Sequence, residues 1–241
     1  ARIFMLLLFL TVWELFADFH IIDSFFFSSP SRVVACFVRM VSERSLFTHI
    51  GITLTETVIS FFLVALVSLS AATLLWYSRR LSEILEPFLV VLNSLPKSAL
   101  APLLIVWLGT GMDTIIAAGI SVAIFGAIIN LYTGFLQADP EKLLLIRTLG
   151  GTRRDCFFKV VLPASIPVIL SNMKVNIGLS LVGVVIGEFL AARRGLGYLI
   201  IYGSQVLQLD MLITSILLLC IIAMGLYQLL QFAEHCYKKK V

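Results

Sequence analysis

Six apolar runs, each close to the length that crosses a lipid bilayer, dominate this sequence. They cover about residues 3–19, 54–76, 88–108, 115–136, 166–190 and 211–233. A helix needs about 20 apolar residues to cross the hydrocarbon core, and a backbone in hydrocarbon must satisfy its own hydrogen bonds. The composition agrees, because 60% of the residues are hydrophobic and only 13% are charged. We therefore predict an all-α, multi-pass membrane protein with about six transmembrane helices.

Two of the six predicted spans have features that blur their boundaries. The first carries Glu14 and Asp18 near its end and could also be an uncleaved signal sequence. The third contains Pro96 and Pro102, and proline interrupts the hydrogen bonds of a helix. The organisation that we expect is a first transmembrane helix over 1–20, an extracytoplasmic loop with a short helix over 21–53, a helical core over 54–233, and a basic tail over 234–241.

The loop lysines and arginines predict the orientation of the chain. An even number of spans puts both termini on one side of the membrane. That side would hold Arg2, Arg79, Arg80, Lys142, Arg147, Arg153, Arg154, Lys159, Lys238, Lys239 and Lys240. The other side would hold Arg32, Arg39, Arg44, Arg193 and Arg194. Because cytoplasmic loops are enriched in these residues, we expect both termini and the loop over 139–163 to be cytoplasmic. The same bias explains the net charge of +4, so we expect contact with membrane lipid and no nucleic-acid partner.

The residues that usually carry chemistry are scattered. The cysteines and histidines lack the spacing of metal ligands, and we predict neither a metal site nor a disulfide. These residues are Cys36, Cys156, Cys220, Cys236, His20, His49 and His235. No span offers a nucleophile with a base or two facing carboxylates, which argues against an enzyme. We find no internal repeat of the kind that secondary transporters use, so a self-sufficient transporter or channel is the weaker alternative.

The loop over 139–163 interrupts the apolar pattern with the signals of two short helices. Asp139 is suited to cap a helix, Pro140 to occupy its first turn, and Glu141 to add an acidic group there. This first helix should continue to Leu149. An amphipathic segment of this kind could also lie flat on the lipid surface.

A pair of glycines separates the two predicted helices. Gly150 and Gly151 can adopt the positive φ that stops a helix. Thr152 should then cap a second helix, with Asp155 placed almost as in a capping box. We expect Pro163 and the following Pro167 to end that helix. Its exposed basic residues would be Arg153, Arg154 and Lys159.

The spacing in this loop resembles a known family. Gly150, nine further residues, Val160, one residue and then Leu162-Pro163 are similar to the EAA loop of ABC importer permeases. The resemblance covers about residues 25–235 and is greatest to the branch that imports sulfonates, taurine, nitrate and vitamin precursors. Other matching stretches are Arg147-Thr148-Leu149-Gly150, Val160-Val161-Leu162-Pro163-Ala164, Pro30-Ser31, Leu95-Pro96-Lys97, Leu100-Ala101-Pro102-Leu103 and Gly195-Leu196-Gly197-Tyr198-Leu199-Ile200. One departure is plain, because Leu144-Leu145-Ile146 stand where the family has Glu-Ala-Ala.

The resemblance implies a type I ABC importer transmembrane-domain fold and a permease subunit that moves a small, anionic or heteroaromatic solute into the cytoplasm of a bacterium across its inner membrane. Residues 139–163, which we call the coupling segment, would seat in a cytoplasmic ATPase dimer. The chain lacks the G-x-x-x-x-G-K-[ST] phosphate loop, so ATP and Mg would bind to those partner subunits and no cofactor to this chain. A second copy of the chain and an extracytoplasmic solute-binding protein are the other expected partners. The coupling residues implied are Leu144, Arg147, Thr148, Leu149, Gly150, Gly151, Thr152, Arg153, Arg154, Leu162 and Pro163.

Polar residues within the spans are candidates for the translocation path, because polar groups are costly in lipid. They are Asn93, Pro96, Lys97, Asn172, Asn176 and Glu188. Lys97 could face an anionic solute or extend its amine to the membrane surface. Asn172 and Asn176 could line the inner mouth or join helices, and Glu188 could contact solute or pair with Arg193 or Arg194. By resemblance, the contact with the binding protein would involve Gly195, Leu196, Gly197 and Tyr198.

Overall fold

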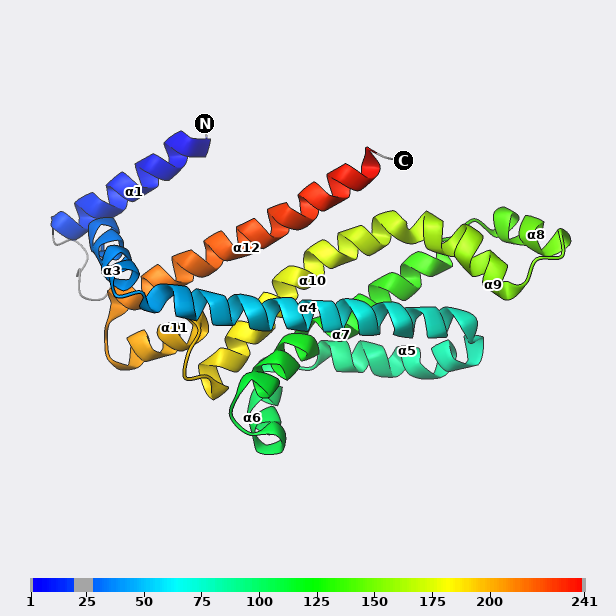
Figure 1. The fold of residues 1–241 in the computed structure, drawn as a ribbon, viewed down its shortest axis with the longest axis horizontal. Helices are drawn as coiled ribbons and strands as arrows, with labels where there is room; N and C mark the ends of the chain where they lie inside the picture. The colour runs from blue at the N-terminus through cyan, green and yellow to red at the C-terminus, as the bar shows by residue number, and fades with distance from the viewer. Residues whose placement is uncertain (1, 20–27, 240–241) are drawn as a thin grey trace.

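A computed structural model describes residues 2–19 and 28–239 of the chain (Figure 1). His20, Lys240 and residues 21–27 of the predicted outer loop lie outside the described residues. Within the described ranges the secondary structure is entirely helical, which confirms the predicted all-α class. The elements are α1 (Arg2–Asp18), α3 (Pro30–Ser42), α4 (Ser45–Tyr77), α5 (Arg79–Ser94), α6 (Lys97–Leu108), α7 (Met112–Leu136), α8 (Pro140–Thr148), α9 (Arg153–Cys156), the π-helical turn η1 (Phe157–Val161), α10 (Leu162–Ala191), α11 (Leu196–Gln205) and α12 (Leu209–Lys238).

Three long helices, α4, α7 and α10, form the centre of the bundle. Small residues let their backbones approach closely, as is usual between membrane helices. A Cβ added at Gly183 of α10 would lie 2.7 Å from the Cα of Gly119 on α7. A Cβ added at Gly119 would lie 2.6 Å from Oγ of Ser60 on α4. Gly119 and Gly183 therefore set the close spacing of these three helices.

Within residues 2–19 and 28–239, four helical stretches are long and apolar enough to cross a bilayer. They are Ser45–Tyr77, Met112–Leu136, the continuous stretch Arg153–Ala191 and Leu209–Cys236. The first predicted span is α1, whose 17 residues extend for about 25 Å, slightly less than a hydrocarbon core.

The span predicted over 88–108 is interrupted next to Pro96, one of the two prolines that blurred its boundaries in the sequence. Helix α5 begins at Arg79, and α5 and α6 meet at an angle of 96°. The break falls at Leu95, which has extended backbone angles of φ −63° and ψ 139°. Proline at the next position disfavours the helical conformation of the residue before it. Pro102, in contrast, is accommodated inside α6.

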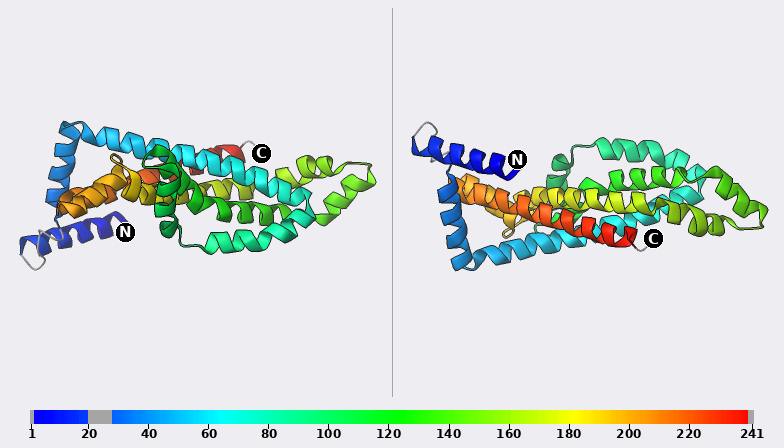
Figure 2. Two further views of the ribbon diagram at one scale, coloured as in Figure 1. Left: turned by 90° about the horizontal axis from the view of Figure 1, so that it is seen from below. Right: turned by 90° about the horizontal axis from the view of Figure 1, so that it is seen from above.

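The two ends of the bundle carry different short elements. Helix α3 crosses one end between α4 and α12 (Figure 2). Its N-terminus is capped by Ser29, whose side chain accepts a hydrogen bond from the backbone N–H of Arg32. Helix α11 packs at the same end. Helices α8 and α9 project beyond the other end of α4 and α7 (Figure 1). The first two helices of the coupling segment therefore project from the end of the bundle opposite to α3.

Candidate functional site: the coupling segment and the groove beside it

The first helix of the coupling segment begins where the sequence predicts. The Asp139 side chain accepts a hydrogen bond from the backbone N–H of Glu141 at 2.9 Å, and Pro140 occupies the first turn. The helix ends at Thr148, one residue before the predicted end. Gly150 follows with φ +81°, a left-handed conformation that glycine adopts without strain.

The elbow between the two helices is closed by backbone hydrogen bonds. Gly150 N–H donates to the carbonyl of Arg147 at 3.0 Å, and Gly151 N–H donates to that of Ile146 at 2.8 Å. Gly151 packs so closely on α8 that an added Cβ would lie 2.7 Å from the Ile146 carbonyl oxygen. Both glycines are therefore needed, Gly150 for its backbone angle and Gly151 for its lack of a side chain.

The second helix opens with a complete capping box. Thr152 Oγ1 accepts from the backbone N–H of Asp155, and the Asp155 carboxylate accepts from the backbone N–H of Thr152 at 2.9 Å. Lys159 adds an ion pair with Asp155 at 2.8 Å. This arrangement satisfies N–H groups that a helix start otherwise leaves unpaired.

The prediction that Pro163 and Pro167 end this helix is wrong. Helix α9, the π-helical turn η1 and α10 form one continuous helical stretch from Arg153 to Ala191. Pro163 stands in the first turn of α10, where a missing N–H costs little, and Pro167 is accommodated further inside the helix. The π-helical turn was not among the elements predicted from the sequence. The coupling segment consequently continues into α10 without an intervening loop.

Aromatic packing holds the second helix against the bundle. Phe157 is buried and lies 5.2 Å from Trp76 and 5.6 Å from Phe135, measured between ring centroids. Arg153 donates a hydrogen bond to the Trp76 carbonyl at 3.1 Å, and its guanidinium lies 5.5 Å from the centre of the Trp76 ring. These contacts join the coupling segment to the ends of α4 and α7. Phe157 and Trp76 were not among the residues predicted from the sequence.

The predicted coupling residues separate into two groups in space. Leu144 and Leu149 are 63% and 75% exposed at the tip of the segment, although they are apolar. Leu162 lies instead at the base of α10, where it packs against the core around Phe157. The residues exposed at or near the tip also include Leu145, Arg147, Thr148, Gly150, Arg153 and Arg154.

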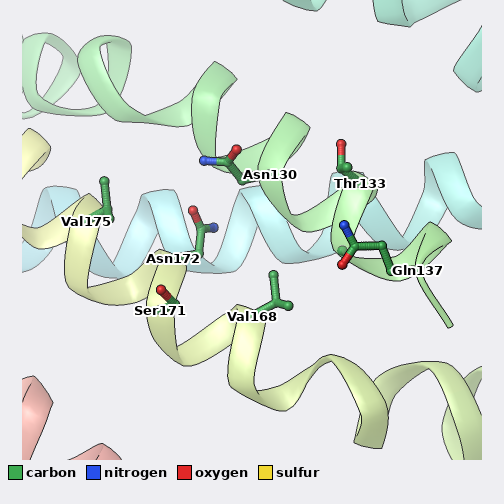
Figure 3. Close-up of a pocket in the computed structure, with 8 residues that line it drawn as sticks. Asn130, Thr133, Gln137, Val168, Ser171, Asn172 and Val175 are labelled. Atoms are coloured by element: carbon green, nitrogen blue, oxygen red, sulfur yellow. The ribbon is translucent and has the colours of Figure 1, made fainter.

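A polar groove of about 300 Å³ lies between α7 and α10, next to the base of the coupling segment (Figure 3). Its lining residues are Asn130, Thr133, Gly134, Gln137, Val168, Ser171, Asn172 and Val175. Of these residues, only Asn172 was predicted from the sequence. The others could have been found from their spacing, because polar residues at 130, 133 and 137 recur at helical intervals along α7.

The asparagines predicted for the translocation path lie on two helices, Asn172 and Asn176 on α10 and Asn93 on α5. Asn172 is buried and donates a hydrogen bond from Nδ2 to the Ala127 carbonyl at 3.3 Å, and Asn176 is buried one turn further along α10. Asn93 faces α7, where its Oδ1 would lie 3.3 Å from a Cβ added at Gly126.

Lys97 closes the bend between α5 and α6. Its amine donates to the carbonyls of Leu92 and Asn93 at the end of α5 and lies 5.2 Å from the centre of the Phe125 ring. Lysine at a helix C-terminus satisfies carbonyls that lack a helical partner. The Lys97 amine is therefore engaged in capping a helix at the break, an arrangement that neither of the two interpretations of the sequence anticipated.

Glu188 joins α4 to the turn that follows α10. Thr53 donates to one carboxylate oxygen of Glu188 at 2.6 Å, and Gly197 N–H donates to the other at 2.5 Å. Thr53 Oγ1 also accepts from Leu196 N–H at 2.9 Å. The expected ion pair of Glu188 with Arg193 or Arg194 is not formed among the described residues, because the carboxylate points into the bundle while both arginines are exposed.

The same turn holds the four residues that the resemblance implied for contact with a binding protein. Gly195, Leu196 and Gly197 are buried over Glu188, and Gly195 has φ +118°. A Cβ at Gly195 would lie 2.4 Å from the Glu188 carboxyl carbon. Tyr198 alone among the four is partly exposed. The glycines here allow the turn to close over a buried carboxylate, so three of the four predicted contact residues face inward.

Comparison with known proteins identifies the class of protein that this fold and this segment define. Residues 64–233 match the family described as "Binding-protein-dependent transport system inner membrane component", and the chain belongs to this family. It is a multi-pass membrane permease component and not itself an enzyme.

Individual relatives agree with this class. The chain is 30% identical to a probable ABC transporter permease protein of Haemophilus influenzae, over 94% of this chain and 91% of the relative. It is 28% identical to the formylaminopyrimidine transport permease protein ThiX of Halalkalibacterium halodurans, over 80% and 76% of the two chains. It is 26% identical to the taurine transport system permease protein TauC of Escherichia coli, over 89% and 80%. These relatives confirm the branch that the sequence resembled.

Solved structures confirm the fold. An inward-facing structure of the MetNI methionine ABC transporter matches with a TM-score of 0.68, covering 83% of this chain and 97% of that one at 20% identity. The chain therefore has the fold of a type I ABC importer permease. It is the permease component of an importer for a small solute.

Proposed function

We propose that this chain and a second copy of itself form a pore in a bacterial inner membrane, through which a small anionic or heteroaromatic solute enters the cytoplasm. An extracytoplasmic binding protein delivers the solute. A cytoplasmic ATPase dimer, which binds ATP and Mg, drives the pore by holding the coupling segment of each copy. The relatives named for formylaminopyrimidine and taurine transport support a solute of similar size.

The observation that carries this proposal is the apolar tip of the coupling segment. Leu144 and Leu145 on α8, and Leu149 just after it, are exposed, and α8 projects beyond the bundle (Figure 1). A short helix buries no residue of its own here and depends on a partner for stability. Exposed leucines beside Arg147 fit a groove with an apolar floor and an acidic rim.

The remainder of the coupling segment has the stiffness that force transmission needs. Its second helix is fixed to α4 by Arg153 and by the packing of Phe157, and it continues without a break into α10. A displacement of the tip is therefore transmitted to the membrane as a tilt of α10. A segment that merely lay on lipid would not need these tertiary contacts.

The break between α5 and α6 supports a second copy as the partner within the membrane. Ser94, Leu95 and Pro96 are exposed there, where the helix is interrupted. Interrupted backbone at membrane depth is tolerated only where protein or a water-filled cavity covers it. Among its residues α5 buries only Ser82 and α6 only Ala101, so both helices have a free apolar face for the second copy.

The basic residues around the coupling segment support a cytoplasmic position for it and for both termini. Lys142, Arg147, Arg153, Arg154 and Lys159 lie on the side of the membrane that the lysine and arginine distribution makes cytoplasmic. The ATPase partner would meet the permease on this side.

Co-purification tests the proposal directly. The chain should be extracted in mild detergent from cells that carry its native neighbours, and an ATPase should accompany it. Uptake into proteoliposomes should require internal ATP at the face that carries the coupling segment. Uptake that follows an ion gradient without ATP would contradict the proposal and favour a secondary transporter.

A further inference from the structure

We propose that the groove between α7 and α10 is a solute-contact site at the inner mouth of the pore. The site binds an uncharged, planar solute whose edge carries amide-like hydrogen-bond donors and acceptors. This inference rests on the proposed function. It narrows the expected solute from an anionic or heteroaromatic compound to a heteroaromatic one. The residues that would make contact are Asn130, Thr133, Gln137, Ser171 and Asn172.

The position of the groove requires a polar occupant. From Asn130 to Gln137 the groove follows the last turns of α7 over about 10 Å, from the cytoplasmic end toward the middle of the membrane. Asn130, Thr133, Gln137 and Ser171 are exposed there. Exposed amides and hydroxyls inside a bilayer are expensive unless they face protein, water or a ligand. We infer that this face of the helices borders the pore.

The chemistry of the lining suits hydrogen bonding in both directions. Three primary amides and two hydroxyl groups line the groove, and each group can both donate and accept. Asn172 is buried with its Nδ2 used by the Ala127 carbonyl, while its Oδ1 has no partner within the described structure. A buried carbonyl oxygen without a donor is destabilising, so an N–H of a solute would restore its missing hydrogen bond.

The charges around the groove disfavour an anion. None of the eight lining residues is basic. Lys174, on the same helix, forms an ion pair with Glu234 at 2.6 Å, and Lys97 is engaged by the carbonyls of α5. A sulfonate or carboxylate that left water here would lack a cation to offset its desolvation. An amide, ureide or aminopyrimidine edge loses less on leaving water and finds complementary groups.

The groove also lies where motion of the coupling segment reaches the membrane. Helices α7 and α10 touch at its floor, where a Cβ on Gly134 would lie 2.6 Å from Cγ1 of Val168. Val168 lies six residues after the start of α10, close to the coupling segment from which that helix continues. A tilt of α10 would therefore widen or narrow the groove and release a bound solute.

Protection from thiol labelling tests the site in the complete assembly of permease and ATPase in proteoliposomes, with the exposed Cys220 and Cys236 replaced by serine. Ser171→Cys and Thr133→Cys are labelled from the cytoplasmic face with N-ethylmaleimide. A neutral aminopyrimidine should slow labelling, whereas ethanesulfonate at the same concentration should leave the rate unchanged. Adding Asn172→Leu should weaken protection by about tenfold, because one hydrogen bond is lost.

Two further variants test whether protection depends on the groove itself. Asn130 is exposed, so Asn130→Leu should weaken protection without disturbing packing, while Gln228→Leu on the exposed face of α12 should leave protection intact. Protection by ethanesulfonate but not by the aminopyrimidine would overturn the inference. So would cysteines that do not label at all. In either case, ATP-driven uptake with a co-purifying ATPase would leave the proposed function standing, whereas loss of the ATPase would contradict the proposed function itself.

Discussion

The glycine elbow of the coupling segment gives the sharpest prediction, because its two glycines are required for different physical reasons. At Gly150, φ is +81° and no atom lies within 4 Å of an added Cβ, so alanine there meets only backbone strain. That strain is about 1–2 kcal/mol, which corresponds to a roughly five- to thirtyfold loss of the native elbow relative to other conformations. We expect Gly150→Ala to weaken coupling without abolishing it.

Alanine at Gly151 meets a different obstacle. Its Cβ would lie 2.5 Å from Cγ2 of Ile146 and 2.7 Å from the Ile146 carbonyl oxygen. The first neighbour can rotate away, but the second is backbone, so the end of α8 must move. We expect Gly151→Ala to impair coupling more than Gly150→Ala, because a displaced α8 changes the surface that the ATPase meets.

The assay measures ATP hydrolysis and solute uptake by the same proteoliposomes, so that coupling is the ratio of the two rates. Gly178→Ala in α10 is the matched control, because that glycine is helical and an added Cβ there meets no atom within 4 Å. Its coupling ratio should equal that of the native protein. Native ratios for both elbow variants would refute the idea that a stiff elbow transmits the motion.

Three further outcomes are expected. Thr152→Ala removes the capping box, and this loss of about 1 kcal/mol should speed hydrogen exchange at the start of α9. Arg153→Leu removes the hydrogen bond and ring contact to α4, so it should reduce uptake more than Arg154→Leu does; equal effects would contradict the anchoring role. Thr53→Val deprives Glu188 of a donor, and this should lower thermal stability by about 1–3 kcal/mol, while Thr55→Val on the exposed face should change little.

Local signals in the sequence were enough to predict the helices of the coupling segment. The cap at Asp139, the positive φ at Gly150 and the capping box at Thr152 depend on residues close together in the chain. The apolar runs likewise predicted the membrane-crossing helices, because the bilayer imposes their length. Interactions of this kind are visible without knowing which helices are neighbours.

Features that depend on neighbouring helices could not be predicted in the same way. Pro163 and Pro167 were predicted to end a helix. The helical stretch is instead continuous through both prolines, and Phe157 within it packs against α4 and α7. Glu188 was expected to contact solute or to pair with Arg193 or Arg194, yet it accepts hydrogen bonds from a threonine of α4 and from the backbone of a turn nine residues later. The polar groove combines α7 with α10, so only one of its five polar residues stood out from the sequence.

Site-directed cross-linking of the coupling segment tests the central claim most directly. Leu144→Cys, in a chain whose exposed Cys220 and Cys236 are serine, should form a cross-link with the ATPase subunit and react with a membrane-impermeant thiol reagent at the cytoplasmic face. The yield of the cross-link should change when ATP is added, because the ATPase subunits move. Reaction of Leu144→Cys from the opposite face of the membrane, or with a lipid-soluble reagent alone, would contradict the account.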